Sequence, residues 1–128
     1  MLILPIKKKW YDMIKTGEKL EEYREIKDYY TTRFMNILGE THYKDPNEGW
    51  RRAMMDDFIG ECRVNWYAGE PFKVMFRNGY SKMSPFIIAE CILTVGTGKP
   101  EWGAEADKEY FILNIQSLET AEPEVFDE

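Results

Sequence analysis

The chain alternates short apolar stretches with charged segments, and its beginning already defines two elements. Apolar residues at positions 2–4 predict a strand that ends at Pro5, because proline cannot donate a hydrogen bond to a sheet. Between residues 7 and 16 the apolar side chains return at spacings of three and four, which is typical of a helix. They are Trp10, Met13 and Ile14. Gly17 follows where a glycine lets the chain turn sharply after a helix.

A strand with charges on both faces is predicted next, at about residues 19–27. Because side chains alternate in a strand, one face carries Leu20, Glu22, Arg24 and Ile26. The other face carries Lys19, Glu21, Tyr23 and Glu25. If Leu20 and Ile26 point into a core, the acid and the base between them are buried too, and burying charges is costly unless they are paired or used. This segment is therefore the first place to look for function.

A second helix is predicted after an ambiguous stretch at 28–34 and a polar loop at 39–43. Residues 45–48 combine a capping aspartate, a proline suited to the first helical position and a capping-box glutamate. Apolar side chains then recur every four residues, and they are Trp50, Met54 and Phe58. Gly60 is placed to end this helix, which we expect to pack against the core.

From Cys62 onward the pattern is that of β-structure. It predicts strands at residues 63–67, 72–77, 85–95 and 110–115, with turns or loops at 68–71 and 96–100. The pair Asn78-Gly79 is a strong signal for a two-residue hairpin. No internal repeat or domain linker is visible. Several strands with few helices predict a small α+β protein with a closed or nearly closed barrel.

The composition fits one globular domain. The chain has 128 residues, of which 44% are hydrophobic and 15% aromatic, enough for a core of its own. Cys62 and Cys91 make no disulfide framework, and their apolar surroundings predict reduced core residues. No secretory or membrane-spanning apolar run is visible, so we expect a cytoplasmic protein without membrane contact.

Charge is distributed unevenly along the chain, whose net charge is −6 at pH 7. Residues 1–35 hold eight Lys and Arg against six Asp and Glu, residues 36–99 are balanced, and residues 100–128 hold one against nine. A net-acidic chain is untypical of nonspecific nucleic-acid binders, whose affinity depends on neutralising phosphates. A local basic surface near the N-terminus is compatible with these counts, and the acidic tail is typical of a frayed, solvated end.

Common chemical motifs find little support. The Gly-Lys pair at 98–99 resembles part of a phosphate-binding loop, but that motif needs glycine where Leu93 stands and Ser or Thr where Pro100 stands. His42 is the single histidine and the two cysteines lie far apart, so a metal site or a Ser-His-acid triad has little to build on. A carboxylate-only divalent site stays open, and no cofactor is expected.

Lys19, Glu22 and Arg24 remain as candidates. In one interpretation they are a surface lysine and an ion pair on a strand, which stabilise little. In the other they bind a ligand or act on it. Glu90 interrupts the apolar strand at 86–95, and it lies either across the barrel from Arg24 or toward solvent.

These residues resemble a known family. Gly17, Lys19, Glu22 and Arg24 match the G-x-K-x-x-E-x-R signature of ASCH domains, a branch of the PUA-like superfamily. Residues 5–10 resemble the strand-to-helix entry of that family, where a lysine like Lys7 often occurs. The segments 86–98, 102–103 and 110–113 resemble its closing barrel strands, so the similarity spans most of the chain.

The resemblance implies a small PUA-like β-barrel with flanking helices, one domain at 1–118 with a helical insert at about 35–70, and an acidic tail at 119–128. It also implies a cleft beside the motif that binds RNA or a nucleotide-like ligand. The residues expected there are Lys7, Lys19, Glu22, Tyr23, Arg24 and Trp102. Positive charge comes from the cations, while Glu22 orients Arg24 or accepts a hydrogen bond from a base. Candidates for stacking with bases, each alternatively a core residue, are Trp10, Tyr23, Tyr80 and Trp102.

A hydrolase acting on a modified nucleoside or on RNA is the alternative. Some similar proteins are amidohydrolases that act on acylated cytidine with a lysine, a threonine nucleophile and a distant glutamate, and a few ASCH domains are ribonucleases. Lys19 matches the lysine, but Glu22 stands where the threonine would be, which argues against simple inheritance of that reaction. In an enzyme, Lys19 and Glu22 would be catalytic, with Glu105 as a loosely placed partner. A third hypothesis is a protein-interaction domain whose acidic tail docks a basic partner.

Overall fold

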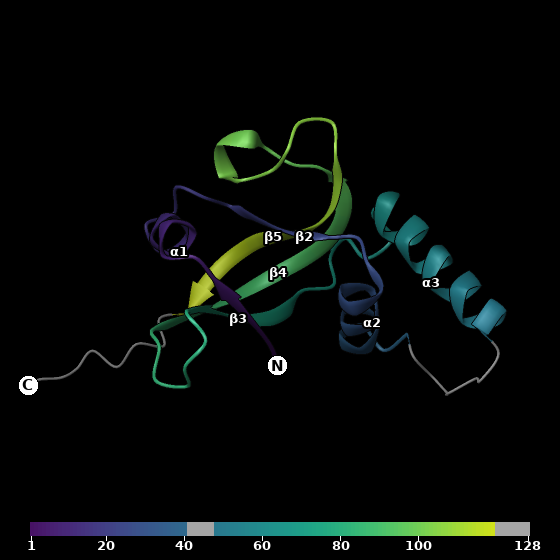
Figure 1. Ribbon diagram of the computed structural model, residues 1–128, viewed down its shortest axis with the longest axis horizontal. Coiled ribbons are helices and arrows are strands. Elements are labelled where there is room, and N and C mark those ends of the chain that lie inside the picture. Colours follow the sequence, from purple (N-terminus) through teal and green to yellow (C-terminus); the bar gives the residue numbers. More distant parts are fainter. Residues whose placement is uncertain (41–47, 120–128) are drawn as a thin grey trace, which may run out of the picture.

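Five strands form one sheet that curls into a half-barrel (Figure 1). The structure is a computed structural model that describes residues 1–40 and 48–119. The strands are β1 (Leu2–Ile6), β2 (Glu21–Glu25), β3 (Phe72–Asn78), β4 (Phe86–Thr97) and β5 (Glu109–Glu119). Their order is β1-β3-β4-β5-β2, in which β1 pairs with β3 in parallel and every other pair is antiparallel. The strands β1 and β2 are therefore the two edges of the curled sheet.

Three α-helices flank this sheet. They are α1 (Lys8–Lys15), α2 (Asp28–Ile37) and α3 (Glu48–Arg63), and a short 3-10 helix, η1 (Pro100–Trp102), lies in the connection between β4 and β5. In Figure 1, α1 lies on one side of the strands, and α2 and α3 lie on the other. The described part of the chain is thus a mixed α+β fold, as the sequence pattern predicts.

The inner face of the sheet forms the main core. Along β4 the buried positions alternate with more exposed ones, and the buried residues are Ile87, Ala89, Cys91, Leu93 and Val95. Glu90 lies between Ala89 and Cys91 and faces the other way, in register with Lys73 on β3 and Ser117 on β5. Glu90 therefore points away from the core rather than across the barrel toward Arg24.

A second, smaller cluster lies around the β4–β5 connection. Its buried members are Tyr23, Ala104, Tyr110 and Ile112, and Trp102 packs against them. The rings of Tyr23 and Tyr110 are 5.6 Å apart, a distance typical of favourable aromatic pairs. This cluster fixes the connection against β2 and β5.

The strands predicted at 72–77, 85–95 and 110–115 are confirmed as β3, β4 and β5. The strand predicted at 63–67 is wrong, because α3 runs to Arg63 and a turn follows it. Tyr67 in that turn is buried, with its ring 5.5 Å from that of Phe58.

Three other local predictions are also wrong. The first strand does not end at Pro5, because β1 continues to Ile6 in register with β3. A two-residue hairpin at Asn78-Gly79 does not form, since β4 begins only at Phe86 and the Asn78 N–H donates to the Pro85 carbonyl at 2.8 Å. Gly60 does not end α3, which continues to Arg63. The physical reason lies in packing, because Cys62 beyond the glycine is fully buried.

Helix α3 packs on the core as predicted, with Phe58 buried and Met54 partly buried against it, and only Trp50 of the three predicted residues is exposed. Its buried residues are Met55, Phe58 and Cys62, at spacings of three and four, whereas Trp50 is 50% exposed. The ambiguous stretch at 28–34 lies in α2. The capping residues 45–47 lie outside the described residues, as does the acidic tail beyond Glu119. The domain limits, including the insert at 35–70, stay predictions.

Both cysteines are free and buried, as predicted. Burial raises the pKa of the Cys62 thiol and that of the Cys91 thiol to about 12, so both are protonated at neutral pH.

Candidate functional site

A tight turn after α1 directs Lys19 into the protein. Gly17 has a φ of +84°, a conformation that glycine adopts readily. Its N–H donates to the Ile14 carbonyl at 3.0 Å. The N–H groups of Glu18 and Lys19 both donate to the Met13 carbonyl, at 2.9 and 3.0 Å. These bonds satisfy carbonyls at the end of α1 and reverse the chain just before β2, as the glycine predicts.

The predicted assignment of faces is wrong at the start of this segment. Leu20 is 51% exposed, whereas Lys19 is only 1% exposed. The physical reason is that β2 begins at Glu21, so the two preceding residues lie in the connection from α1 and do not follow the alternation of the strand. Lys19 thus takes the buried position that the pattern gives to Leu20.

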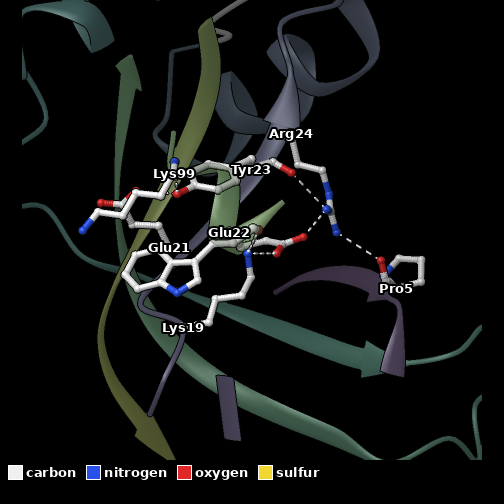
Figure 2. Close-up of polar contacts among 8 residues, drawn as sticks. Pro5, Lys19, Glu21, Glu22, Tyr23, Arg24 and Lys99 are labelled. Atoms are coloured by element: carbon white, nitrogen blue, oxygen red, sulfur yellow. Dashed lines mark hydrogen bonds and ion pairs between the residues drawn. The ribbon is translucent and has the colours of Figure 1, made fainter. Parts of the chain in front are cut away.

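The ammonium group of Lys19 is enclosed by four partners. Figure 2 shows it beside the carboxylate of Glu22. Its Nζ donates to the Trp102 carbonyl at 2.6 Å and lies 3.2 Å from Oε1 of Glu22. It also lies 4.9 Å from the ring centroids of both Trp10 and Tyr23, within the range of cation–π contacts. Burial lowers the pKa of Lys19 below its ordinary value, and the carboxylate of Glu22 offsets part of that shift. The lysine thus ties the β4–β5 connection to β2.

Glu22 is the centre of the cluster. It is buried, and its two carboxylate oxygens serve different cations. Oε1 faces Lys19, while Oε2 accepts a short hydrogen bond from Nη1 of Arg24. A buried carboxylate is tolerated when its charge is paired in this way.

Arg24 joins the two edges of the half-barrel. Its Nη2 donates to the Pro5 carbonyl on β1 at 3.0 Å, and its Nη1 also donates to the Tyr23 carbonyl at 3.1 Å (Figure 2). Proline at this position of β1 has no N–H, but its carbonyl still needs a donor. The guanidinium therefore bridges the seam that the unpaired edges of β1 and β2 leave open.

Tyr23 holds the β4–β5 connection from the other side. Its hydroxyl donates to Oε1 of Glu21 at 2.8 Å and accepts from the Lys99 N–H at 2.9 Å. Burial raises the pKa of Tyr23, so its hydroxyl stays protonated at neutral pH. The connection approaches so closely that a Cβ on Gly98 would lie 2.6 Å from the Tyr23 ring. Only glycine fits there without rearrangement.

An open cleft of about 750 Å³ lies along this seam. Residues of β1 (3–6) and of β2 (22–24) line it from the two edges of the sheet. Its aromatic lining residues are Trp10, Tyr23, Tyr29, Tyr30, Tyr80, Trp102 and Tyr110. Charged side chains on the lining are those of Lys7, Lys8, Glu22 and Arg24. The cleft is thus aromatic, and three of its four charged groups are positive.

Of the six residues expected at a ligand cleft, five line this one: Lys7, Glu22, Tyr23, Arg24 and Trp102. Lys19 does not line it, because the ammonium lies behind Trp10, Tyr23 and Trp102. Trp10 and Tyr80, the other stacking candidates, also belong to the lining. Glu105 is exposed and lies 3.7 Å from Lys108 instead.

Sequence reasoning misses several contributors to the site. The carbonyls of Pro5 and Trp102 accept hydrogen bonds from the cluster, and no sequence pattern marks a backbone acceptor. Tyr29 and Tyr30 line the cleft from the first turn of α2. The signal for these two was available, since two adjacent tyrosines stand five and six positions after Arg24.

Comparison of the chain with family models, with curated proteins and with solved structures gives no match. Within residues 1–40 and 48–119, no group of three or more His, Cys, Asp and Glu side chains is gathered as for a metal ion. In the same part of the chain, no helix has the length and apolar character needed to cross a membrane.

Proposed function

We propose that this chain binds RNA or a nucleotide-like ligand in the cleft between β1 and β2. The observation that supports this most directly is the lining of the cleft, where aromatic rings and cations surround one open space beside a buried ionic cluster. A volume of about 750 Å³ is within the usual range of small-ligand sites. Bases stack on aromatic rings, and phosphates pair with cations, so both parts of a nucleotide find partners here.

The local charge favours an anionic ligand although the whole chain is acidic. Lys7 and Lys8 line the cleft from the start of α1, where Lys8 also pairs with Asp12 at 2.6 Å, and Arg24 lines it from β2. Lys7 is exposed, so its charge is accessible to a ligand. Arg24 is held in place by Glu22 and two backbone carbonyls, and such an oriented guanidinium suits a phosphate or a base edge.

The proposal includes the ASCH-like, PUA-like interpretation of the half-barrel. Its support is the position of the signature residues: Glu22 and Arg24 line the cleft, and Lys19 holds the wall behind it. Gly17 makes the turn that brings the lysine there.

Anisotropy of a labelled eight-nucleotide single-stranded RNA of mixed sequence tests the proposal. We expect binding that weakens as salt is raised, because phosphate contacts release counterions. Lys7→Glu should weaken binding several-fold. Arg51→Glu is the matched control, since Arg51 is exposed on α3 and does not line the cleft. If the wild type does not bind, or if both charge reversals have the same effect, the proposal is wrong.

A hydrolase is the second candidate function, and one observation favours it. Burial lowers the pKa of Lys19, and a lysine of lowered pKa is better suited to proton transfer than an ordinary one. However, its ammonium is enclosed, and both oxygens of Glu22 are engaged by cations. Both carboxylate oxygens of Glu22 are therefore already occupied by partners within the protein, and neither is directed at a substrate. We therefore rank binding above catalysis.

Incubation with N-acylated cytidine and with RNA, followed by chromatography, separates the two candidates. A product that disappears in Glu22→Gln, at a temperature where circular dichroism shows that variant to be folded, but persists in Glu105→Gln would establish the hydrolase. The absence of any product, together with binding in the anisotropy experiment, would leave the binding function alone.

A further inference from the structure

Rings with a cation over one face stand at both ends of the cleft. At one end, Nζ of Lys99 lies 4.8 Å from the ring centroid of Trp102. At the other, the guanidinium of Arg33 lies 3.9 Å from the ring centroid of Tyr29. Two more pairs of this kind are Lys9 with Trp10, at 4.7 Å, and Lys27 with Tyr30, at 5.5 Å. Ring and cation together recur in sites for single-stranded nucleic acid, because they offer stacking and charge at once.

The two ends are separated by the length of β2. Trp102 is bound to Lys19, which precedes the strand, and Tyr29 lies in the first turn of α2, which follows it. In Figure 1, α1 and α2 accordingly lie at opposite ends of β2. Five residues of strand span about 16 Å, whereas stacked rings have centroids about 4.5–7 Å apart. One base therefore cannot stack on the rings at both ends.

Tyr29 and Trp102 are also accessible in different degrees. Tyr29 is 55% exposed, while Trp102 is partly buried in the cluster with Tyr23. A ring that is fixed from behind offers a rigid platform, and an exposed ring at the cleft rim can receive a later base of the same strand. Between them, Arg24 lies 5.8 Å from the ring centroid of Tyr30 and lines the cleft.

We propose that the cleft takes at least two successive nucleotides of one RNA strand, with one base on Trp102 and a later one on Tyr29. This inference rests on the proposed function and adds the ligand class, an unpaired oligonucleotide rather than a mononucleotide. Bases inside a duplex are stacked on each other and are not available to such rings. Lys99 and Arg33 lie over the two rings and outside the lining of the cleft, and in this proposal they pair with phosphates that flank the two bases.

The test compares probes of different length on the full chain. Matched adenylate and uridylate series are used, each with the 5′-mononucleotide, the dinucleotide and an eight-residue single strand. We expect affinity to rise at least about tenfold from mononucleotide to octamer, since each stacked base adds a contact. Tyr29→Ala should weaken octamer binding about tenfold and leave mononucleotide binding unchanged. Trp102→Ala should weaken both.

Trp66→Ala is the matched control, because Trp66 is 69% exposed and does not line the cleft. If Trp102→Ala fails to fold, Trp102→Phe, which keeps a ring, replaces it, and the Tyr29 comparison decides. Equal affinity for mononucleotide and octamer, or equal effects of Tyr29→Ala and Trp66→Ala on the octamer, would overturn the inference while binding in the cleft stands. If no probe binds at all, the proposed function falls together with it.

Discussion

Lys19 and Arg24 bind the same carboxylate but lie in opposite surroundings. Lys19 is 1% exposed, and a carbonyl, a carboxylate and two rings enclose its ammonium. The side chain of Arg24 is 13% exposed and lines the open cleft. One end of the cluster is thus closed and structural, while the other end is open to a ligand. Two cations that bind one carboxylate can therefore have different roles. Lys19 holds the structure together, Arg24 is accessible from the cleft, and Glu22 connects them.

The difference follows from the chemistry of the two cations. A lysine is a single charge on a long apolar chain, so it can fill a buried channel and end on one carbonyl and one carboxylate. A guanidinium has five donors in a planar fork and can bridge several acceptors at once. Arg24 uses this fork to span the carboxylate of Glu22 and the carbonyls of Tyr23 and Pro5.

Removing the charge of Glu22, the carboxylate that both cations share, should have the largest effect on stability. Glu22→Gln leaves the Lys19 ammonium buried without a counter-charge, which should lower the free energy of unfolding by about 3–4 kcal/mol. Urea denaturation measures this. Glu105→Gln is the control, because the side chain of Glu105 is 75% exposed and its substitution should change stability by about 0.5 kcal/mol or less. A Glu22 variant as stable as that control would show that the two ends are not joined through this carboxylate.

Replacing each cation by methionine should lower the free energy of unfolding by different amounts. Lys19→Met leaves the closed end without its link to the Trp102 carbonyl, and we expect a loss of about 3 kcal/mol. Arg24→Met should cost only about 1 kcal/mol, because its carbonyl partners are next to the open cleft, where water can replace the guanidinium. RNA binding should show the stronger effect for Arg24→Met. Equal losses of stability would remove the distinction between a closed and an open end.

A substitution at Gly98 tests the packing of the closed end without changing any of its charges. An alanine Cβ at Gly98 would lie 2.6 Å from the Tyr23 ring and 2.8 Å from the Cβ of Ala104. Gly98→Ala should therefore lower the free energy of unfolding by about 2 kcal/mol through overpacking. Gly60→Ala is the matched control, since nothing lies within 4 Å of its Cβ position in α3, and alanine should stabilise the helix by about 0.5–1 kcal/mol. The same sign in both variants would contradict close packing at Gly98.

The sequence correctly predicts those elements of the fold that depend on the residues of a single short segment. Strands β3, β4 and β5 are long apolar or alternating runs, and Gly17 ends α1 with a turn that glycine favours. The α+β class follows from the same patterns. Five of the six residues that the family resemblance indicates line the cleft, and their role in binding stays a prediction. Lys7, Tyr23 and Trp102 are among these five.

The remaining features depend on contacts between distant parts of the chain. Lys19 is buried because the Trp102 carbonyl, 83 positions away, receives its ammonium. Arg24 is fixed by the Pro5 carbonyl, 19 positions away. Neither carbonyl has a signature in the sequence, since every residue has one. Leu20 is exposed although it is hydrophobic. The buried position beside it is occupied by Lys19, whose carbonyl partner lies far away in the sequence.

The pH dependence of stability gives the smallest and most specific comparison. Burial holds the pKa of Lys19 in the folded chain below its ordinary value of 10.5. Between the two pKa values the unfolded chain binds more protons, so the contribution of Lys19 to the free energy of unfolding rises with pH across that window. Urea denaturation from about pH 8 to about pH 10 should thus show a rise in the wild type relative to Lys19→Met, because other groups cancel in the difference. Parallel profiles would mean that the enclosed ammonium carries no desolvation penalty, and the closed end would then be no different from the open one.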